Sequence, residues 1–328
     1  MNKQRLKILL IWIFILNIIL IPIASHSENK ANPKVQWAWD AEPFAADADL
    51  LTLWVCPLVG ADCMLLTYEG HSMLVDVGDR TTTAQVETFL KEAGVDHVDY
   101  VFSTHPHADH IGGIFALVER GFPIGALITT FDHDYYEDRQ VVIQRQAIDA
   151  VEAAGIPVID LRTEDTIPFG SASLTIYRVP DDRIEQQMNC NCLSAMLMVK
   201  VGDCSLLLTA DVEGRSQKVL AELYDLDADI LKFPHHGLSY ANEAFLREAD
   251  PELTFINHGS ANSKRAQSQL KEEGYSWIMY ANWGTIVLRT DGTRWTVEQR
   301  FTNDIWKHAI KTFKLDSDAV KNWLNDTK

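Results

Sequence analysis

Residues 105–110 read His-Pro-His-Ala-Asp-His and place three imidazoles and one carboxylate within six positions. They directly follow the apolar run Tyr100–Ser103, which is typical of a buried strand. Imidazole and carboxylate together suit zinc, iron or manganese. His105 and His107 can converge on one side of a short loop while Asp109 and His110 turn to the other. This arrangement suits two adjacent cations better than one, and a solvated loop that is His-rich by chance is the weaker interpretation.

Three further stretches place polar side chains at the end of an apolar run. They are Leu74-Val75-Asp76-Val77-Gly78, Leu206-Leu207-Leu208-Thr209-Ala210-Asp211 and Ile230-Leu231-Lys232-Phe233-Pro234-His235-His236-Gly237. Together with the first stretch they resemble, in order, the four motifs of the metallo-β-lactamase-fold hydrolases. The resemblance covers about residues 50 to 290. It implies an α/β fold, a four-layer αβ/βα sandwich, with a dinuclear metal site between the two sheets.

The resemblance also implies a role for each polar residue. His105 and His107 would hold one ion, Asp109 and His110 would help to hold the second, and Asp211 would bridge both. His236 resembles the last ligand and His235 a group that supports the ligands or faces the substrate, although the two could exchange roles. The expected cofactors are two divalent ions, zinc foremost, with manganese or iron as alternatives. Such a pair of ions can lower the pKa of a shared water toward roughly 7. Because Asp109 and Asp211 would hold these ions, they are the candidate catalytic residues.

Two aspartates near strand ends, Asp76 and Asp62, are candidates for orienting the ligand histidines. An ordinary turn aspartate is an equally good interpretation of Asp62 and a weaker one of Asp76. Where many relatives place a third histidine on the first metal, this chain has residues 188–192, Met-Asn-Cys-Asn-Cys. A thiolate from Cys190 or Cys192 is one candidate ligand there, and the resemblance favours Asn191 instead.

Within that superfamily the chain is similar to the extracellular hydrolase domain of the DNA-uptake protein ComEC and its stand-alone relatives. It shares their Pro-His-His-Gly ending, their Asn-x-x-Ser spacing at Asn191 and Ser194, and a closing hairpin at residues 284–288. It departs from them at Val59-Gly60-Ala61-Asp62, at Ala210 and at Leu238. The segment that would carry a further histidine reads Asn262-Ser263-Lys264-Arg265. The similarity implies a phosphodiester substrate.

The start of the chain has the layout of a secretory signal. Lys3, Arg5 and Lys7 precede an apolar run from Ile8 to Ala24, and a polar stretch with Ser25 and Ser27 follows. Cleavage after Ser27 is one expectation, and an uncleaved membrane anchor is the alternative. Both predict a location outside the cytoplasm. The predicted organisation is a signal or anchor over 1–27, a linker or extension over 28–48, the hydrolase domain over 49–303 and a helical tail over 304–328.

The net charge limits the classes of substrate and partner that the protein can bind. The 328-residue chain has a formal net charge of −17, and loss of residues 1–27, with three basic and no acidic side chains, changes this to −20. Such a surface repels polyanions, so a small-molecule or cell-envelope substrate is favoured over nucleic acid. Membrane contact is expected only through the N-terminal segment. A β-lactam, lactone or thioester hydrolase is the second reading, and a non-catalytic binding protein that keeps the fold is the third.

The remaining features are weaker. Five cysteines are too sparse for a disulfide framework, and Cys56 and Cys63 could pair or be buried as small apolar groups. Strand-like runs alternate with helical patterns from Leu51 to Gln299, which favours a layered α/β domain. His258 could line the cleft, although a surface loop is favoured; His71 reads as a turn residue, and residues 132–134, Asp-His-Asp, read as a solvated loop.

Overall fold

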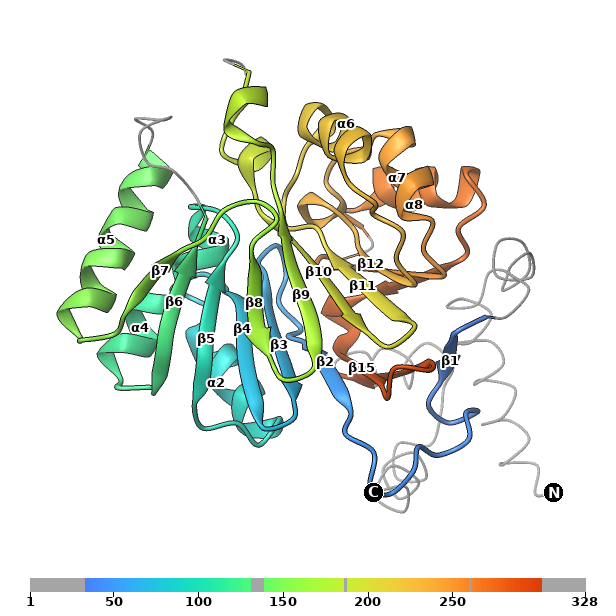
Figure 1. The fold of residues 1–328 in the computed structure, drawn as a ribbon, viewed down its shortest axis with the longest axis horizontal. Coiled ribbons are helices and arrows are strands. Elements are labelled where there is room, and N and C mark those ends of the chain that lie inside the picture. The colour runs from blue at the N-terminus through green and yellow to red at the C-terminus, as the bar shows by residue number, and fades with distance from the viewer. Residues whose placement is uncertain (1–32, 131–138, 186–187, 260, 303–328) are drawn as a thin grey trace.

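The computed structural model describes residues 33–130, 139–185, 188–259 and 261–302. Two β-sheets lie face to face, and helices cover the outer face of each (Figure 1). In the described residues, nine strands form the first sheet in the order β1-β16-β15-β2-β3-β4-β5-β6-β7. Seven form the second in the order β14-β13-β12-β11-β10-β9-β8.

The strands of the first sheet are β1 (Val35–Trp37), β2 (Leu51–Val55), β3 (Cys63–Tyr68), β4 (His71–Val77), β5 (Val98–Ser103), β6 (Ile124–Thr129), β7 (Val158–Asp160), β15 (Gly284–Thr290) and β16 (Trp295–Phe301). Those of the second are β8 (Thr166–Phe169), β9 (Ala172–Tyr177), β10 (Met196–Val201), β11 (Cys204–Leu208), β12 (Ile230–Lys232), β13 (Leu253–Ile256) and β14 (Trp277–Tyr280).

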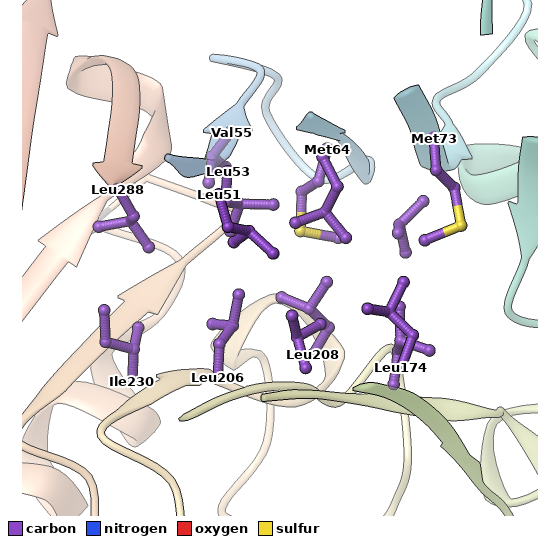
Figure 2. Packing of buried hydrophobic residues seen from close by; sticks show 14 of the residues in the cluster. Leu51, Leu53, Val55, Met64, Met73, Leu174, Leu206, Leu208, Ile230 and Leu288 are labelled. Carbon is purple, nitrogen blue, oxygen red and sulfur yellow. The ribbon is translucent and has the colours of Figure 1, made fainter. Parts of the chain in front are cut away.

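The main core lies between the sheets. Leu53 and Met73 of the first sheet face Leu206 and Leu208 of the second (Figure 2). Successive strand residues point to opposite faces, so Leu207 packs instead under the outer helices. Both faces of these strands are therefore buried, which explains why they read as continuous apolar runs without alternation.

Helices complete the outer layers. The first sheet carries α2 (Thr83–Glu92), α3 (Ala108–Ile111), α4 (Ile114–Glu119) and α5 (Arg139–Ala153), and the second carries α6 (Gly214–Leu223), α7 (Glu243–Ala249) and α8 (Lys264–Glu272). Apolar clusters fill the space between each sheet and its helices. The predicted four-layer αβ/βα sandwich is confirmed. No helix in these described segments is long and apolar enough to cross a membrane.

Parallel pairing brings the chemically interesting loops together. Strands β4, β5 and β6 are parallel in the first sheet, and β11, β12 and β13 are parallel in the second. The carboxyl ends of parallel strands meet at one edge of a sheet, where open α/β proteins bind ligands. Each polar motif of the sequence follows one of these strands or ends it.

Three local features differ from the sequence-based expectation. Within residues 28–48, Val35–Trp37 form β1, which pairs in parallel with β16. Strand β8, for which the sequence shows no strand signal, contains Pro168 and is an edge strand, where proline is tolerated in a sheet. The loop expected after β5 contains a helical turn, α3. The signal, the residues 132–134 and the tail from 304 fall outside the described residues.

The five cysteines all lie in the described part of the chain, where each is buried and none is in a disulfide. Cys56 and Cys63 face each other across β2 and β3, with the Cys56 N–H donating to the Cys63 carbonyl at 3.0 Å. Of the two interpretations of this pair, burial as small apolar groups is the one that the structure shows.

Candidate metal centre

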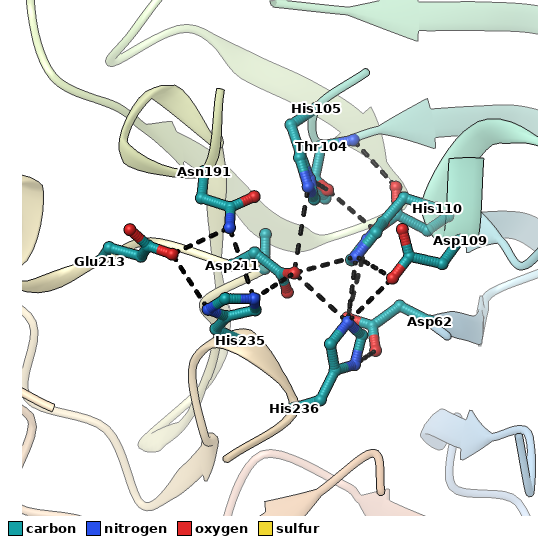
Figure 3. Close-up of polar contacts among 12 residues, drawn as sticks. Asp62, Thr104, His105, Asp109, His110, Asn191, Asp211, Glu213, His235 and His236 are labelled. Carbon is teal, nitrogen blue, oxygen red and sulfur yellow. Dashed lines mark hydrogen bonds and ion pairs between the residues drawn. The ribbon is translucent and has the colours of Figure 1, made fainter. Parts of the chain in front are cut away.

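Asp211 is the carboxylate on which the histidines converge. It follows β11 and is almost fully buried. Its Oδ2 atom lies 3.2 Å from His236 Nε2 and 3.3 Å from His110 Nε2. The same oxygen lies 4.0 Å from Nε2 of both His105 and His235 (Figure 3). Four imidazole nitrogens from two loops therefore surround one carboxylate oxygen.

The loop after β5 supplies the other predicted ligands. His105 is fully buried and its ring centre lies 4.7 Å from that of His107, which precedes the first turn of α3. Asp109 and His110 lie within that turn, so a helical backbone separates them from His105 where a loop was expected. Asp109 Oδ2 lies 3.4 Å from His236 Nε2. The structure thus brings His105, Asp109 and His110 to the same centre as Asp211, and places the His107 ring beside that of His105.

Asp76 supports two of these histidines from behind. Its Oδ2 lies 2.7 Å from His110 Nδ1 and accepts a 2.8 Å hydrogen bond from the Thr104 hydroxyl. The Thr104 oxygen lies 3.0 Å from His105 Nδ1. Contacts of this kind at Nδ1 fix the ring and leave Nε2 directed at the centre. Asp76 therefore lies at Nδ1 of His110, where a carboxylate can orient the ring.

Asp62 lies behind His236. Its Oδ1 is 3.1 Å from His236 Nδ1 and accepts a 2.8 Å hydrogen bond from the side-chain amide of Asn257. The ammonium of Lys232 lies 2.6 Å from Asp62 Oδ2 and 3.7 Å from Asp211 Oδ1. Lys232 is fully buried, so it is an internal positive charge between two buried carboxylates.

His235 faces a further carboxylate that the sequence did not single out. Glu213 Oε1 lies 3.1 Å from His235 Nδ1. The same oxygen accepts a 3.0 Å hydrogen bond from the side-chain amide of Asn191, whose nitrogen is also 3.4 Å from His235 Nε2. Asn191 and the nearby Ser194 are buried, as is the rest of this turn.

Burial and close opposite charges shift the pKa values of the histidines and carboxylates of the centre. Burial alone would lower the pKa of His110, but Asp211 and Asp76 raise it well above its usual value. Burial also acts to lower the pKa of His236, but Asp211 and Asp62 raise it well above its usual value. Burial acts to raise the pKa of Asp211, but the imidazoles of His236 and His110 outweigh it and hold that pKa well below the usual range. Burial and the nearby His110 lower the pKa of His105. The carboxylates of the centre thus require positive charge around them.

The nitrogen and oxygen donors around Asp211, and the buried atoms among them that lack hydrogen bonds, both fit a site for divalent cations. One oxygen or nitrogen atom from each of Asp109, His110, Asp211 and His236 lies within 4.8 Å of the other three. Among the described residues, His105 Nε2 and Asp211 Oδ1 are buried without a hydrogen-bond partner. Buried polar atoms rarely stay unsatisfied in proteins. Metal ions that replace the protons on the imidazoles would satisfy these atoms and balance the carboxylates.

Three side chains of the centre are partly exposed to solvent. The side chains of Asp109, Glu213 and His235 are 36%, 30% and 24% exposed, whereas His105 and His110 are fully buried. A substrate would therefore approach past these three side chains.

Other sequence-based candidates lie elsewhere or differ from expectation. Cys190 and Cys192 pack in the apolar cluster under the second sheet's helices and are absent from the ligand groups found in the described residues. His258 is 9% exposed, so the expectation of a surface histidine is wrong; its Nδ1 accepts a 2.7 Å hydrogen bond from the Gly259 N–H. His71 begins β4 and lies 3.3 Å from Asp99 Oδ2, at the far end of the sheet.

Three residues of the centre were missed from the sequence: Lys232, Asn257 and Glu213. Lys232 carried a usable signal, because a lysine within the apolar stretch Ile230–Phe233 must find a buried partner. Asn257 directly follows the apolar β13, which is a weaker signal of the same kind. Glu213 gave none, since an acidic residue before a helix is common.

The family model described as the Metallo-beta-lactamase superfamily matches residues 56–258, more than half of the chain. No curated protein sequence matches this chain significantly. Among solved structures it is similar to CmlA, a diiron beta-hydroxylase from Streptomyces venezuelae (14% identity, TM-score 0.48, covering 76% of this chain and 55% of that one). It is also similar to a diphosphatase from the PhnP family (13%, TM-score 0.46, 73% and 98%). A third is MEM-A1, a subclass B3 metallo-beta-lactamase from a soil metagenome library (15%, TM-score 0.40, 71% and 95%). The chain thus spans about half the length of the hydroxylase.

Proposed function

This chain belongs to the metallo-beta-lactamase superfamily, and we propose that it is an exported hydrolase that cleaves a phosphodiester with the help of two divalent metal ions. It has the fold and the candidate metal site of a metal-dependent hydrolase. The observation that carries the proposal is the convergence of four imidazole nitrogens on Asp211 Oδ2, within 3.2 to 4.0 Å.

The proposed ligands divide around Asp211. Asp109, His110 and His236 would hold one ion, and His105 and His107 would hold the other, with Asp211 shared between them. Two such ions, when bound, lower the pKa of a water molecule and stabilise negative charge that develops on the substrate. Zinc is the proposed metal, because nitrogen and carboxylate donors suit it, with manganese or iron as alternatives.

The chain's own residues prepare the site for this chemistry. Asp76 and Asp62 hold His110 and His236 with Nε2 directed inward. Lys232 offsets the negative charge of Asp62 next to Asp211. Asp109 and His235 are the partly exposed members of the centre.

The substrate class rests on sequence similarity and on charge. The ordered motifs resemble the ComEC-like hydrolases, which implies a phosphodiester. The net charge of −17 disfavours long polyanions, so we propose a small or cell-wall-linked diester. The basic and apolar residues of the first 27 positions support export, either as a cleaved signal or as an anchor.

A test starts from the mature chain, beginning at Glu28 and purified without chelator. We expect elemental analysis to find about two metal ions per molecule, and a chromogenic phosphodiester to be hydrolysed faster than a lactone or a β-lactam. Treatment with a chelator provides the matched control. A chain that takes up no metal on reconstitution would contradict the metal site. Turnover of the lactone or the β-lactam alone would favour the second reading, and a metal-loaded chain that turns over none of these would favour a binding protein.

Export is tested separately. We expect the protein to be recovered outside the cytoplasm with an N-terminus near Glu28, or tethered to the membrane by its first residues. N-terminal sequencing of a soluble cytoplasmic species that begins at Met1 would count against this localisation.

A further inference from the structure

Glu213, Asn191 and His235 form a cluster on the side of Asp211 away from Asp109 and Asp62 (Figure 3). Glu213 precedes α6 and its backbone is held by that helix, with the Gln217 N–H donating to the Glu213 carbonyl at 2.9 Å. Its Oε1 atom contacts both His235 Nδ1 at 3.1 Å and the Asn191 amide at 3.0 Å. A carboxylate that directly precedes a helix therefore lies within ion-pair distance of one His235 nitrogen, which has no hydrogen-bond partner of its own among the described residues.

This contact repeats a pattern found at two proposed ligands. His110 has Asp76 at Nδ1 and Asp211 Oδ2 at Nε2, at 2.7 and 3.3 Å. His236 has Asp62 at Nδ1 and Asp211 Oδ2 at Nε2, at 3.1 and 3.2 Å. His235 has Glu213 and the same Asp211 oxygen at 3.1 and 4.0 Å. A carboxylate at Nδ1 keeps the proton there, so that Nε2 presents a lone pair to a metal ion.

The backbone lets two consecutive histidines reach one oxygen. Along an extended chain, neighbouring side chains point to opposite faces. In η5 (His235–Gly237) both histidines instead adopt positive φ, 48° for His235 and 49° for His236. Such a conformation is strained for a residue other than glycine and is concentrated at functional sites. Here it turns both imidazoles toward Asp211.

Ligand number points in the same direction. Among the residues assigned to the ions, Asp109, His110 and His236 serve one side of Asp211, whereas His105 and His107 alone serve the other. In a tetrahedral site, two atoms that each lie about 2.0–2.2 Å from one ion are about 3.3–3.6 Å apart. Asp211 Oδ2 lies 4.0 Å from Nε2 of both His105 and His235, so binding one ion requires either pair to close by about 0.4–0.7 Å.

We propose that the two histidines of η5 divide between the two ions, with His236 binding the ion at Asp109 and His235 completing the site of His105 and His107. Glu213 is then a positioning residue that holds His235 in the ligating tautomer. The inference rests on the dinuclear site of the proposed function and assigns a complete ligand set to each half.

The experiment measures metal binding rather than turnover. The metal-free mature chain and its variants are titrated with Co²⁺ alone, and visible absorption and equilibrium dialysis report the number and affinity of bound ions. For the parent we expect two ions. For His235→Gln we expect one ion with near-parental affinity and at least a hundredfold loss for the other. For Glu213→Gln we expect both ions, one of them bound about 10- to 100-fold more weakly. His258→Gln, which changes another mostly buried histidine, should match the parent.

Each result bears on a different claim. Two ions bound by His235→Gln with parental affinities would overturn the inference and leave the dinuclear site intact. A parent that binds a single ion would overturn it as well. A parent that binds none would refute the proposed metal centre itself. Should His235→Gln fail to fold, Glu213→Gln decides alone, because a merely structural glutamate would lower the melting temperature without weakening one Co²⁺ site.

Discussion

At the scale of single residues, Asp211 is distinguished by its contacts. Its Oδ2 atom is shared by four imidazoles, and its Oδ1 atom lies 3.7 Å from the Lys232 ammonium. A second buried aspartate, Asp229, has different surroundings: it accepts a 2.8 Å hydrogen bond from the Ser205 N–H and a 3.3 Å one from the Trp295 indole. Asp229 precedes β12, so it lies at the opposite end of the sheet from Asp211.

This contrast gives a matched pair of variants. Asp211→Asn keeps the shape of the side chain but removes the charge shared by both proposed ions. We expect diester hydrolysis to fall at least about a hundredfold, the equivalent of about 3 kcal/mol, with little change in melting temperature. Asp229→Asn should do the reverse, lowering stability by about 1–3 kcal/mol while turnover persists. Equal turnover by Asp211→Asn and the parent would remove Asp211 from the reaction.

Lys232 makes a prediction about stability. It is buried with Asp62 at 2.6 Å, and although burial acts to lower its pKa, Asp62 and Asp211 raise it, so it stays charged. Lys232→Met leaves Asp62 with an uncompensated charge, and we expect a loss of about 3–5 kcal/mol in urea unfolding of the metal-free chain. Lys200→Met removes an exposed pair with Asp225 at 3.8 Å and should cost less than about 1 kcal/mol. Similar losses in the free energy of unfolding for the two variants would show that the buried Lys232–Asp62 pair stabilises the fold no more than an exposed pair does.

The sequence identified the convergent residues that follow apolar runs, because a polar group at the end of a buried strand stands out. It could not identify Glu213, whose importance depends on the positive φ of His235 and on the approach of two loops distant in sequence. It could not decide between His235 and His236 for the same reason. Neither the strand period nor the spacing fixes which face an αL residue presents.

At the scale of elements, β1 connects the two sheets. Val35–Trp37 pairs with β16 in the first sheet. The N–H groups of Lys34 and Val35 donate at 3.0 Å to the Glu252 carboxylate, which lies just before β13 in the second. Trp37 also lies 5.1 Å, ring centre to ring centre, from Trp277 of β14. A run of three residues is too short for periodicity to reveal, so the sequence described this segment only as a linker or extension.

Removal of β1 tests where the folded domain begins. A chain that starts at Asp49 exposes the edge of β16 and leaves the nearly buried Glu252 without its two donors. Loss of Val35 burial alone should cost about 1.5–3 kcal/mol, and the unsatisfied carboxylate adds to it. We expect a lower melting temperature than for the chain that starts at Glu28. A chain that starts at Pro33 keeps β1 and should match the longer one. Equal stability of all three would place the boundary near residue 49.

Strand prediction succeeded where both faces of a strand are covered and failed at the margins. Strands such as β11 and β13 are largely apolar because one face meets the opposite sheet and the other meets helices. The edge strand β8 has alternating burial and contains Pro168, and this pattern does not distinguish it from a loop. Accordingly, the layers could be predicted but not their edges.

At the scale of the whole molecule, charge determines which substrates can approach. The chain carries 46 acidic and 29 basic side chains, and two carboxylates of the centre, Asp109 and Glu213, are themselves partly exposed. Bound metal ions would reverse the sign of the field only close to Asp211. Beyond about 10 Å, at 0.1 M salt, that local field is screened. A small diester needs only the local field, whereas a long polyanion must also lie along the acidic surface.

This difference predicts opposite responses to salt. For the mature chain, kcat/KM on a long single-stranded DNA should be low at 10 mM NaCl and should rise as salt screens the repulsion. On a chromogenic diester with one negative charge, kcat/KM should change little over the same range, and that substrate serves as the control. A protein with a basic nucleic-acid groove would show the reverse, because release of counterions makes its binding to DNA weaken steeply with salt. DNA cleavage that is fastest at low salt and falls as salt increases would therefore contradict the small-diester proposal and identify DNA as the substrate.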